Sequence, residues 1–250
     1  MFSLLLRCSP SEEDLLSAEL WEAGTEGIVE EPGGLRGFFG ASADLARLTQ
    51  RFARFHPELR QEDAVDWEQV SREAWQPLLI GERFFLVPPW RDDPTPPGRL
   101  RLEMTPGMAC GTGHHPCTQL CLKALEQCVQ PGDTVLDVGT GSGILSVAAR
   151  LLGARQVISC DIDPEAVAIA RERLDSAVFV GSADAVRSGF ADVVVANISS
   201  AAIENLAAES ERVRKPESEL ILSGFPEWDQ PGGATAKRVL RDGEWICWIC

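Results

Sequence analysis

Several features are scarce in this sequence of 250 residues, and each scarcity narrows what the chain can be. Lysine and arginine together number 23 against 38 aspartates and glutamates, which gives a formal net charge of -15. Proteins hold nucleic acid mainly through Lys and Arg contacts to phosphates, so this balance disfavours nucleic acid as a partner. The same charge favours a basic protein partner instead.

Long apolar runs are also missing, and we expect neither a membrane span nor a signal peptide. No stretch reaches the roughly 18 apolar residues that a membrane span needs. The first seven residues lack a basic start, and their apolar run is too short for a signal peptide. The eight cysteines lie mostly in apolar segments, where cysteine acts as a small hydrophobic residue, and the final Cys247-Trp-Ile-Cys250 closes the chain instead of opening a helix. We therefore expect a reduced cytoplasmic protein with no disulfide framework.

Two domains are predicted from the order of apolar segments. Residues 1–65 read as strand, helix, strand, strand, helix and strand, an order typical of a small ferredoxin-like α+β domain. The predicted segments are residues 2–8, a helix from a capping pattern at 9–12 to 23, residues 27–31 and 35–39, a helix at 42–55, and a strand at 59–65. Residues 66–98, rich in proline and with a predicted helix at 66–76 and a strand at 83–87, are expected to form a linker.

Residues 99–250 alternate strand and helix patterns. Predicted strands cover residues 134–138, 157–160, 177–180, 192–196 and 219–223, with the last strands compressed into 238–250. Strands that alternate with helices indicate a doubly wound parallel sheet. We therefore assign this part to the α/β class, with a Rossmann-like domain.

A glycine loop between the first two of these strands predicts a nucleoside-containing cofactor. It runs from Asp137 through Gly139, Gly141 and Gly143, and Asp161 ends the next strand. Glycines there let the backbone approach a ligand, and a carboxylate at the second strand end can bind two ribose hydroxyls. The spacing differs from the dinucleotide pattern G-x-G-x-x-G, and the loop holds no basic residue. D-x-G-x-G-x-G instead resembles class I methyltransferases that use S-adenosylmethionine, a cofactor without phosphate.

A second loop, residues 104–118, carries two of the three histidines. A glycine-rich loop is costly to order unless it binds something. Thr118 begins a predicted helix at 119–128, so its hydroxyl is expected to face the same pocket; the alternative is a plain turn and N-cap. Zinc is a rival interpretation, but the spacing gives no paired C-x-x-C and we expect no metal. The candidate zinc ligands are Cys110, His114, His115, Cys117 and Cys121.

Asn197 ends the fourth predicted strand of the sheet. Ligands bind at the carboxyl edge of such sheets, and an asparagine there offers an amide carbonyl to an incoming amine. The alternative is an ordinary Asn turn. Asn197 is followed by Ile198-Ser199, not by the Pro-Pro-aromatic that clamps a flipped base, and the chain has no tyrosine. A protein or small-molecule amine is therefore the favoured acceptor over a nucleobase.

Together these motifs resemble the PrmA family, bacterial methyltransferases of large-subunit ribosomal protein eleven. The similarity covers about residues 60–224, and the motifs are 106–118 (PGMACGTGHHPCT), 136–145 (LDVGTGSGIL), 161–164 (DIDP) and 194–198 (VVANI). The resemblance implies that Thr118, Gly139, Asp161 and Asn197 contact S-adenosylmethionine or line its site, with Gly141 in the same loop. It also implies that the amino-terminal domain holds the ribosomal protein, and that lysine ε-amines, with an α-amine as a further candidate, are methylated. Departures are Cys117 in place of threonine and the shortened segments before Asn197 and after residue 224.

The predicted mechanism is in-line methyl transfer to a neutral amine. Asn197 is expected to orient the amine, and His114 or His115 is a candidate to take its proton through water. Two alternatives stay open: a class I methyltransferase for another protein or small molecule, and a module that binds S-adenosylmethionine without catalysis. The sequence does not give the modified residues, the number of methyl groups, the oligomeric state, or whether the shortened carboxyl end retains activity.

Overall fold

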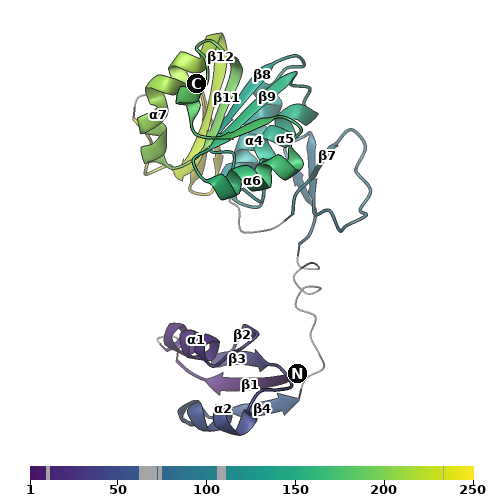
Figure 1. The fold of residues 1–250 in the computed structure, drawn as a ribbon, viewed down its shortest axis with the longest axis vertical. Coiled ribbons are helices and arrows are strands. Elements are labelled where there is room, and N and C mark those ends of the chain that lie inside the picture. Colours follow the sequence, from purple (N-terminus) through teal and green to yellow (C-terminus); the bar gives the residue numbers. More distant parts are fainter. Residues whose placement is uncertain (10–11, 62–71, 73–74, 106–110, 233) are drawn as a thin grey trace. The chain divides into compact units, whose positions relative to one another are not determined.

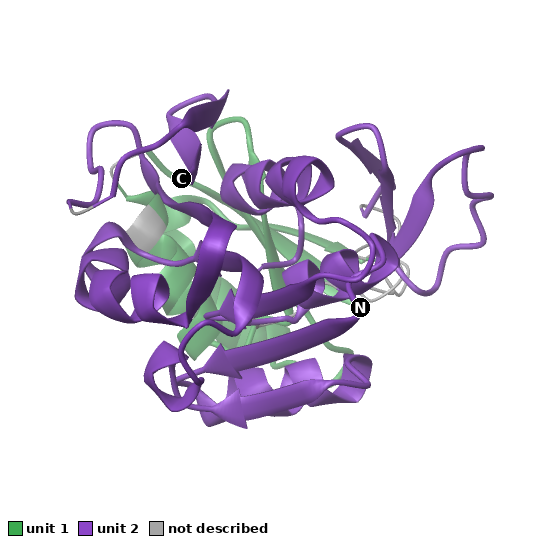
Figure 2. Cartoon of the chain, turned by 90° about the horizontal axis from the view of Figure 1, so that it is seen from above, with its two compact units in different colours: residues 1–74 green, residues 75–250 purple. Residues whose placement is uncertain are grey.

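The computed structural model describes residues 1–9, 12–61, 72, 75–105, 111–232 and 234–250. The chain divides into two compact units, residues 1–74 and 75–250, which are coloured separately in Figure 2 and labelled by element in Figure 1. Each unit is described by itself. Most of the helix predicted at 66–76, the end of the strand predicted at 59–65, and Cys110 of the zinc interpretation lie outside the described residues.

Unit 1 is a four-stranded antiparallel sheet with two helices. Its strand order is β2-β3-β1-β4, and β1 pairs with both β3 and β4. The buried leucines and phenylalanines of β1, α1, β3 and α2 form one core. The elements are β1 (Phe2–Arg7), α1 (Glu13–Glu22), β2 (Gly27–Glu31), β3 (Gly34–Phe39), α2 (Leu45–Arg51), the 3-10 turn η1 (Ala53–Phe55) and β4 (Glu58–Gln61). The ferredoxin-like assignment of this unit stays a prediction.

Both helices of unit 1 begin later than predicted. Ser9 donates its backbone N–H and its hydroxyl to the Glu12 carboxylate, and α1 begins at Glu13. Asp44 caps α2, because its side chain accepts from the Arg47 backbone N–H at 3.1 Å. The single helix predicted at 42–55 is therefore wrong in extent, since α2 is short and is followed by η1.

Unit 2 begins with a small sheet. Strand β6 (Phe84–Val87) lies between β5 (Leu78–Ile80), its antiparallel neighbour, and β7 (Leu100–Glu103), its parallel one. Strands β5 and β6 fall within residues 66–98, the predicted linker. Ile80, Phe84 and Leu102 join the large core of this unit.

The main sheet has seven strands in the order β10-β9-β8-β11-β12-β14-β13. The strands β10, β9, β8, β11 and β12 pair parallel, and β14 pairs antiparallel with β12 and β13. This confirms the predicted Rossmann-like α/β class. The strands are β8 (Thr134–Val138), β9 (Gln156–Asp161), β10 (Ala177–Val180), β11 (Ala191–Asn197), β12 (Arg214–Pro226), β13 (Arg238–Asp242) and β14 (Trp245–Ile249).

Helices pack on both faces of this sheet (Figure 1). On one face, α4 (Pro116–Cys128) and α5 (Ile144–Leu151) share a core with Val193 and Val195 of β11. On the other, α7 (Ser200–Val213) packs with Val194 and Ala196 of the same strand. The alternation along β11 follows from the period of two in a strand. Helix α6 (Pro164–Arg173) forms a smaller cluster with β10 and Val147 of α5.

The connection from β12 to β13 departs from the usual pattern. Both strands pair antiparallel with β14, so they run parallel to each other. Parallel strands need a crossover, usually a helix of a dozen or more residues in all. Residues 227–232 and 234–237, the described part of this crossover, contain no helix. Ala234 and Ala236 instead pack against the core on the α7 face.

No helix in the described residues of the chain has the length and apolar character that crossing a bilayer requires.

Candidate functional site

A crevice of about 360 Å³ opens at the carboxyl ends of β8, β9 and β11. These strands lie where the chain order reverses, with β9 and β10 on one side of β8 and β11 on the other, which is the usual ligand position in open parallel sheets. Its lining residues are Gly111, Val138, Gly139, Thr140, Gly141, Ile144, Leu145, Asp161, Ile162, Gly181, Ser182, Asn197, Ile198, Ser199, Ala202 and Leu206.

The predicted glycine loop forms the floor of this crevice. The backbone N–H groups of Gly139 and Thr140 both donate to the Cys160 carbonyl, at 2.9 and 3.0 Å. Gly139 has φ +73°, and a Cβ there would lie 2.4 Å from Cγ2 of Ile198. Only glycine satisfies both conditions, because other residues rarely adopt positive φ. The loop can therefore pack closely against Ile198, which also lines the crevice.

Asp161 ties the loop to the end of β9. One carboxylate oxygen accepts from the Gly141 N–H at 2.9 Å, and the other accepts from the Asp163 N–H at 3.0 Å. Each carboxylate oxygen has a further lone pair for a ligand hydroxyl. The predicted acid therefore lines the crevice and also fixes the glycine loop.

Asp137 supports the same loop from below. It is fully buried, and its Oδ2 accepts from the hydroxyls of Thr140 at 2.7 Å and Ser146 at 2.6 Å. Ser146 also bonds to Ser159 at 2.6 Å. Burial raises the pKa of Asp137 to about 6, against the lowering effect of the two hydroxyl groups. Its Oδ1 has no hydrogen-bond partner within the described residues.

Asn197 and Thr118 meet at the other end of the crevice. The Asn197 amide Nδ2 donates to Thr118 Oγ1 at 3.2 Å, although 79 positions separate them in the sequence. Thr118 is buried in the first turn of α4, and Asn197 lines the crevice. With the amide nitrogen engaged, the amide oxygen is the end left for another partner. His115, and not Thr118, is the N-cap of α4, since its Nδ1 accepts from the Cys117 N–H at 3.3 Å. The N-cap alternative for Thr118 is thus wrong.

The two histidines brace the start of α4. The His114 ring contacts Trp75 edge-on, with centroids 4.2 Å apart, and the His115 ring contacts Trp245 at 4.7 Å. Burial lowers the pKa of His114, against a raising effect from the Thr112 backbone. Neither ring is among the side chains that line the crevice. The role of His114 as a proton acceptor stays a prediction.

The zinc interpretation finds no support among the described residues, where no group of three or more His, Cys, Asp and Glu side chains is placed to hold a metal. Cys117 and Cys121 are buried on the apolar side of α4. Burial raises the pKa of the Cys117 thiol, which makes it a poorer metal ligand.

Sequence reasoning missed the apolar walls of the crevice. Ile162 follows Asp161 and is 81% exposed, and Leu206 lines the crevice from α7. The sequence did contain a signal for this wall, because a large aliphatic residue, Ile162, directly follows the aspartate predicted to bind the ribose. Such walls suit the flat face of a purine base.

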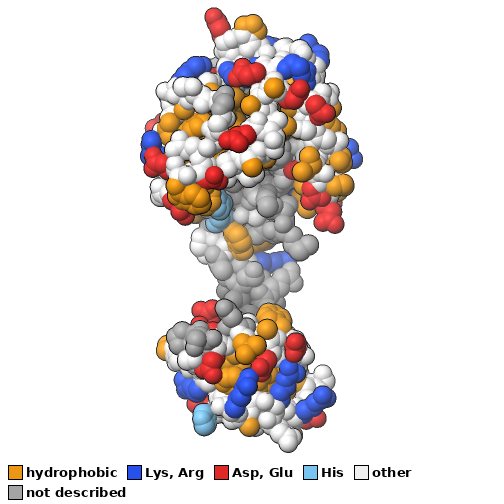
Figure 3. Space-filling view, turned by 90° about the vertical axis from the view of Figure 1, so that its left-hand side faces the viewer, with side chains coloured by type: hydrophobic (Ala, Val, Ile, Leu, Met, Phe, Trp, Pro, Cys, Tyr) orange, Lys and Arg blue, Asp and Glu red, His pale blue; other side chains and the backbone are white. Residues whose placement is uncertain are grey.

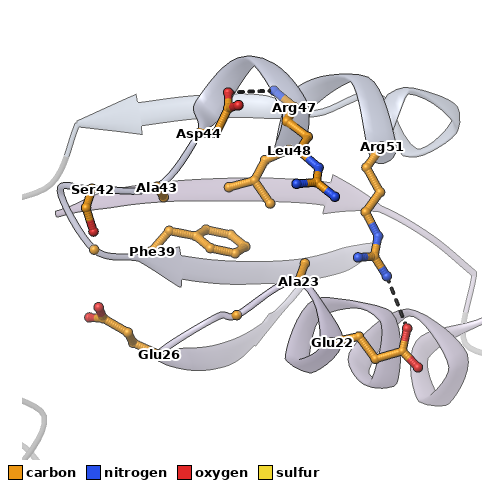
Figure 4. A pocket seen from close by; sticks show the side chains of 12 residues that line it. Glu22, Ala23, Glu26, Phe39, Ser42, Ala43, Asp44, Arg47, Leu48 and Arg51 are labelled. Atoms are coloured by element: carbon orange, nitrogen blue, oxygen red, sulfur yellow. Dashed lines mark hydrogen bonds and ion pairs between the residues drawn. The ribbon is translucent and has the colours of Figure 1, made fainter.

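Unit 1 contains a second hollow, also of about 360 Å³, which no sequence motif predicted. It lies between the end of α1, the end of β3 and α2 (Figure 4). Glu22 and Arg51 form an ion pair at 3.2 Å within it, and Asp44 caps α2 at its rim. Phe39 and Leu48 form its apolar base.

Comparisons with known proteins agree with this geometry. Residues 36–230 match the model of the family described as "Ribosomal protein L11 methyltransferase (PrmA)". The chain is 43% identical over 229 residues to a Burkholderia pseudomallei protein named ribosomal protein L11 methyltransferase, covering 88% of this chain and 74% of that one. A Burkholderia mallei protein of the same name is 43% identical over 217 residues, covering 83% and 71%. The crystal structure of a ribosomal protein L11 methylase from Lactobacillus delbrueckii subsp. bulgaricus superposes with a TM-score of 0.63 at 29% identity, covering 70% and 97%.

Proposed function

The chain belongs to the family of ribosomal protein L11 methyltransferases, and on this basis we propose that it transfers methyl groups from S-adenosylmethionine to amino groups of that ribosomal protein. The observation that carries the proposal is the position of Asn197. Its amide shares one crevice with the glycine loop and Asp161, so an acceptor amine and the cofactor would meet there.

The residues of the crevice fit S-adenosylmethionine. No lysine or arginine is found among the described residues that line it, so no basic side chain there would pair with the phosphates of a dinucleotide. Gly139 has no side chain, and a Cβ at this position would collide with Ile198 in the wall of the crevice. The Asp161 carboxylate offers acceptors for the ribose hydroxyls. Ile162 and Leu206 offer apolar surface to the adenine. We propose Thr118, Gly139, Gly141, Asp161 and Asn197 as the residues of the cofactor site.

When bound, S-adenosylmethionine supplies a methyl group on a positively charged sulfur. The chain has to bring a neutral amine in line with it and exclude water. A free lysine amine has a pKa of about 10.4, and removal from water favours its neutral form. The Asn197 amide oxygen would accept a hydrogen bond from that amine, and Thr118 would keep the amide in this orientation. His114 is the proposed acceptor of the released proton, through water, and burial lowers the pKa of its ring, which favours the neutral form.

The acceptor is proposed to be lysine ε-amines of ribosomal protein L11. The strongly negative chain favours a basic acceptor, and the names of its relatives give the ribosomal protein. Unit 1 is proposed to contact this protein, and the enzyme is proposed to act in the cytoplasm, where ribosomal proteins are made.

Incubation with labelled S-adenosylmethionine and ribosomal proteins from a strain without this enzyme tests the proposal. Label in protein L11 is the expected result, and mass spectrometry of its peptides identifies the methylated amines. Label only in another protein would contradict the proposal that ribosomal protein L11 is the substrate. Cofactor binding without transfer to any ribosomal protein would make the chain a binding module.

A further inference from the structure

Trp228 is a large apolar side chain exposed to solvent in the connection that follows β12. It is 78% exposed, although tryptophan is usually well buried. Within the described residues its indole takes part in no ring contact and lies over no cation. It stands near the start of the helix-free connection between β12 and β13. Residues 227–232 of that connection are called the lip below.

The lip is fixed to the crevice by two hydrogen bonds to α7. Asp229 accepts from the Ser200 hydroxyl at 2.7 Å, and the Gly232 N–H donates to Glu204 at 2.6 Å. Ser200 lies three residues after Asn197 and directly after Ser199, which lines the crevice. Trp228 therefore sits next to a residue that is bonded to the rim of the site.

The end of β12 sets where the lip begins. Asn197 and Ser223 are register partners, and the Ile198 N–H donates to the Ser223 carbonyl at 2.9 Å. At Gly224, with φ +103°, a Cβ would lie 2.2 Å from the Ile198 carbonyl oxygen, so the two strand ends touch. Trp228 follows four residues later. It lies in the part of the crossover that the structure describes, which contains no helix.

Acidic residues adjoin Trp228 on both sides in the sequence. Glu227 and Asp229 flank it in sequence, and Glu244 is held beside the lip because its carbonyl accepts from the Glu227 N–H at 2.8 Å. The cation recorded at this place is Arg241, which pairs with Glu227 at 3.1 Å. The face of unit 2 seen in Figure 3 carries acidic, basic and apolar side chains together. An aromatic face among carboxylates suits the aliphatic stem and charged end of a lysine or arginine.

We propose that the lip is a recognition surface for a basic segment of the acceptor protein, with Trp228 packing on a lysine or arginine side chain close to the amine that is methylated. This inference rests on the proposed function, because the occupant is the acceptor of that same crevice. It makes Trp228 a residue that determines specificity and leaves the transfer step to Asn197.

The test compares steady-state methylation of unmethylated ribosomal protein L11 by the wild type, Trp228→Ala and Trp228→Phe. The alanine variant should raise KM for the acceptor about tenfold or more, the effect of losing a well-packed aromatic contact. Its kcat and its KM for S-adenosylmethionine should not change, and Trp228→Phe should recover most of the loss. Leu79→Ala removes another exposed apolar side chain, from β5, which is 59% exposed against 78% for Trp228, and is the matched control.

A binding measurement keeps this inference separate from the proposed function. The chain has seven tryptophans, so the difference in iodide quenching between the wild type and Trp228→Phe reports on Trp228 alone. Addition of ribosomal protein L11 should protect that signal, and about 0.5 M salt should remove the protection by screening the carboxylates. The proposed role of the lip is contradicted if Trp228→Ala leaves the acceptor KM unchanged, or if the acceptor does not protect Trp228 from iodide quenching. A wild type that protects the signal yet transfers no label overturns the proposed function alone.

Discussion

The two hollows of this chain have nearly the same volume, about 360 Å³, but differ in what lines them. The crevice of unit 2 is walled by glycine backbone and aliphatic side chains, with Asp161 and Asn197 as its main polar side chains. The hollow of unit 1 is lined by charged side chains, of which Glu22 and Arg51 pair with each other. Volume alone therefore does not identify a ligand site.

The difference lies in which polar groups are still free to bind. In the crevice, the hydrogen bonds of Asp161 and Asn197 to other parts of the chain hold each group in place and leave lone pairs for a ligand. In the hollow, the Glu22 carboxylate and the Arg51 guanidinium already pair with each other. Small-molecule sites are mostly apolar with a few fixed polar groups, which describes the first and not the second.

Replacement of Asn197 by alanine should give the largest effect. Methyl transfer should fall by about 100-fold or more, because the amide that orients the amine is lost, as for other preorganised polar groups in active sites. Binding of S-adenosylhomocysteine, measured by calorimetry, should be largely retained. Asn205→Ala, on the exposed side of α7, is the matched control and should behave as the wild type. Turnover that survives in Asn197→Ala would remove this residue from the mechanism.

Replacement of Asp161 by alanine should weaken cofactor binding by about 10- to 100-fold, the loss of hydrogen bonds to a charged group. The variant loses the acceptor for the ribose and the tie to the Gly141 N–H. Asp161→Asn keeps one amide oxygen and should lie between the two. Calorimetry with S-adenosylhomocysteine measures both, and Asp175→Ala, an exposed aspartate after α6, is the control. Equal affinity in Asp161→Ala and the wild type would contradict the proposed cofactor site.

The parts of this site that the sequence predicted together are those whose residues lie close to one another along the chain. The glycine loop and Asp161 belong to one β-α-β unit, so their spacing alone placed them together. Thr118 and Asn197 were each predicted, but the bond between them depends on how α4 packs on the sheet. The start of α4 was predicted too late, because its N-cap is His115, which accepts through its ring and is not a residue that cap preferences favour. The hollow of unit 1 arises from tertiary packing and has no local signal.

The pH dependence of stability should reveal the buried Asp137. Its pKa is raised to about 6 in the folded chain, from 3.8 when exposed, so the folded state binds a proton that the unfolded state releases in this interval. Its contribution to the free energy of unfolding should therefore increase as pH falls from 6 to 5, by up to about 1.4 kcal/mol. Asp137→Asn keeps an acceptor for Thr140 and Ser146 and should lose this dependence. Urea unfolding at several pH values measures it, and an identical slope in both proteins would contradict the assignment.

The smallest effect is expected in unit 1, at the pair that fills its hollow. Glu22 and Arg51 are 74% and 39% exposed at their side chains, and such surface pairs contribute little because water and salt screen them. Glu22→Gln should change the free energy of unfolding by less than about 0.5 kcal/mol and leave the KM for S-adenosylmethionine unchanged. The measurement is urea unfolding together with steady-state methylation. A large rise in the acceptor KM with unchanged stability would show that the hollow binds the acceptor through Glu22. The two hollows would then differ in their ligands, with the charged one contacting a protein and the apolar one holding the cofactor.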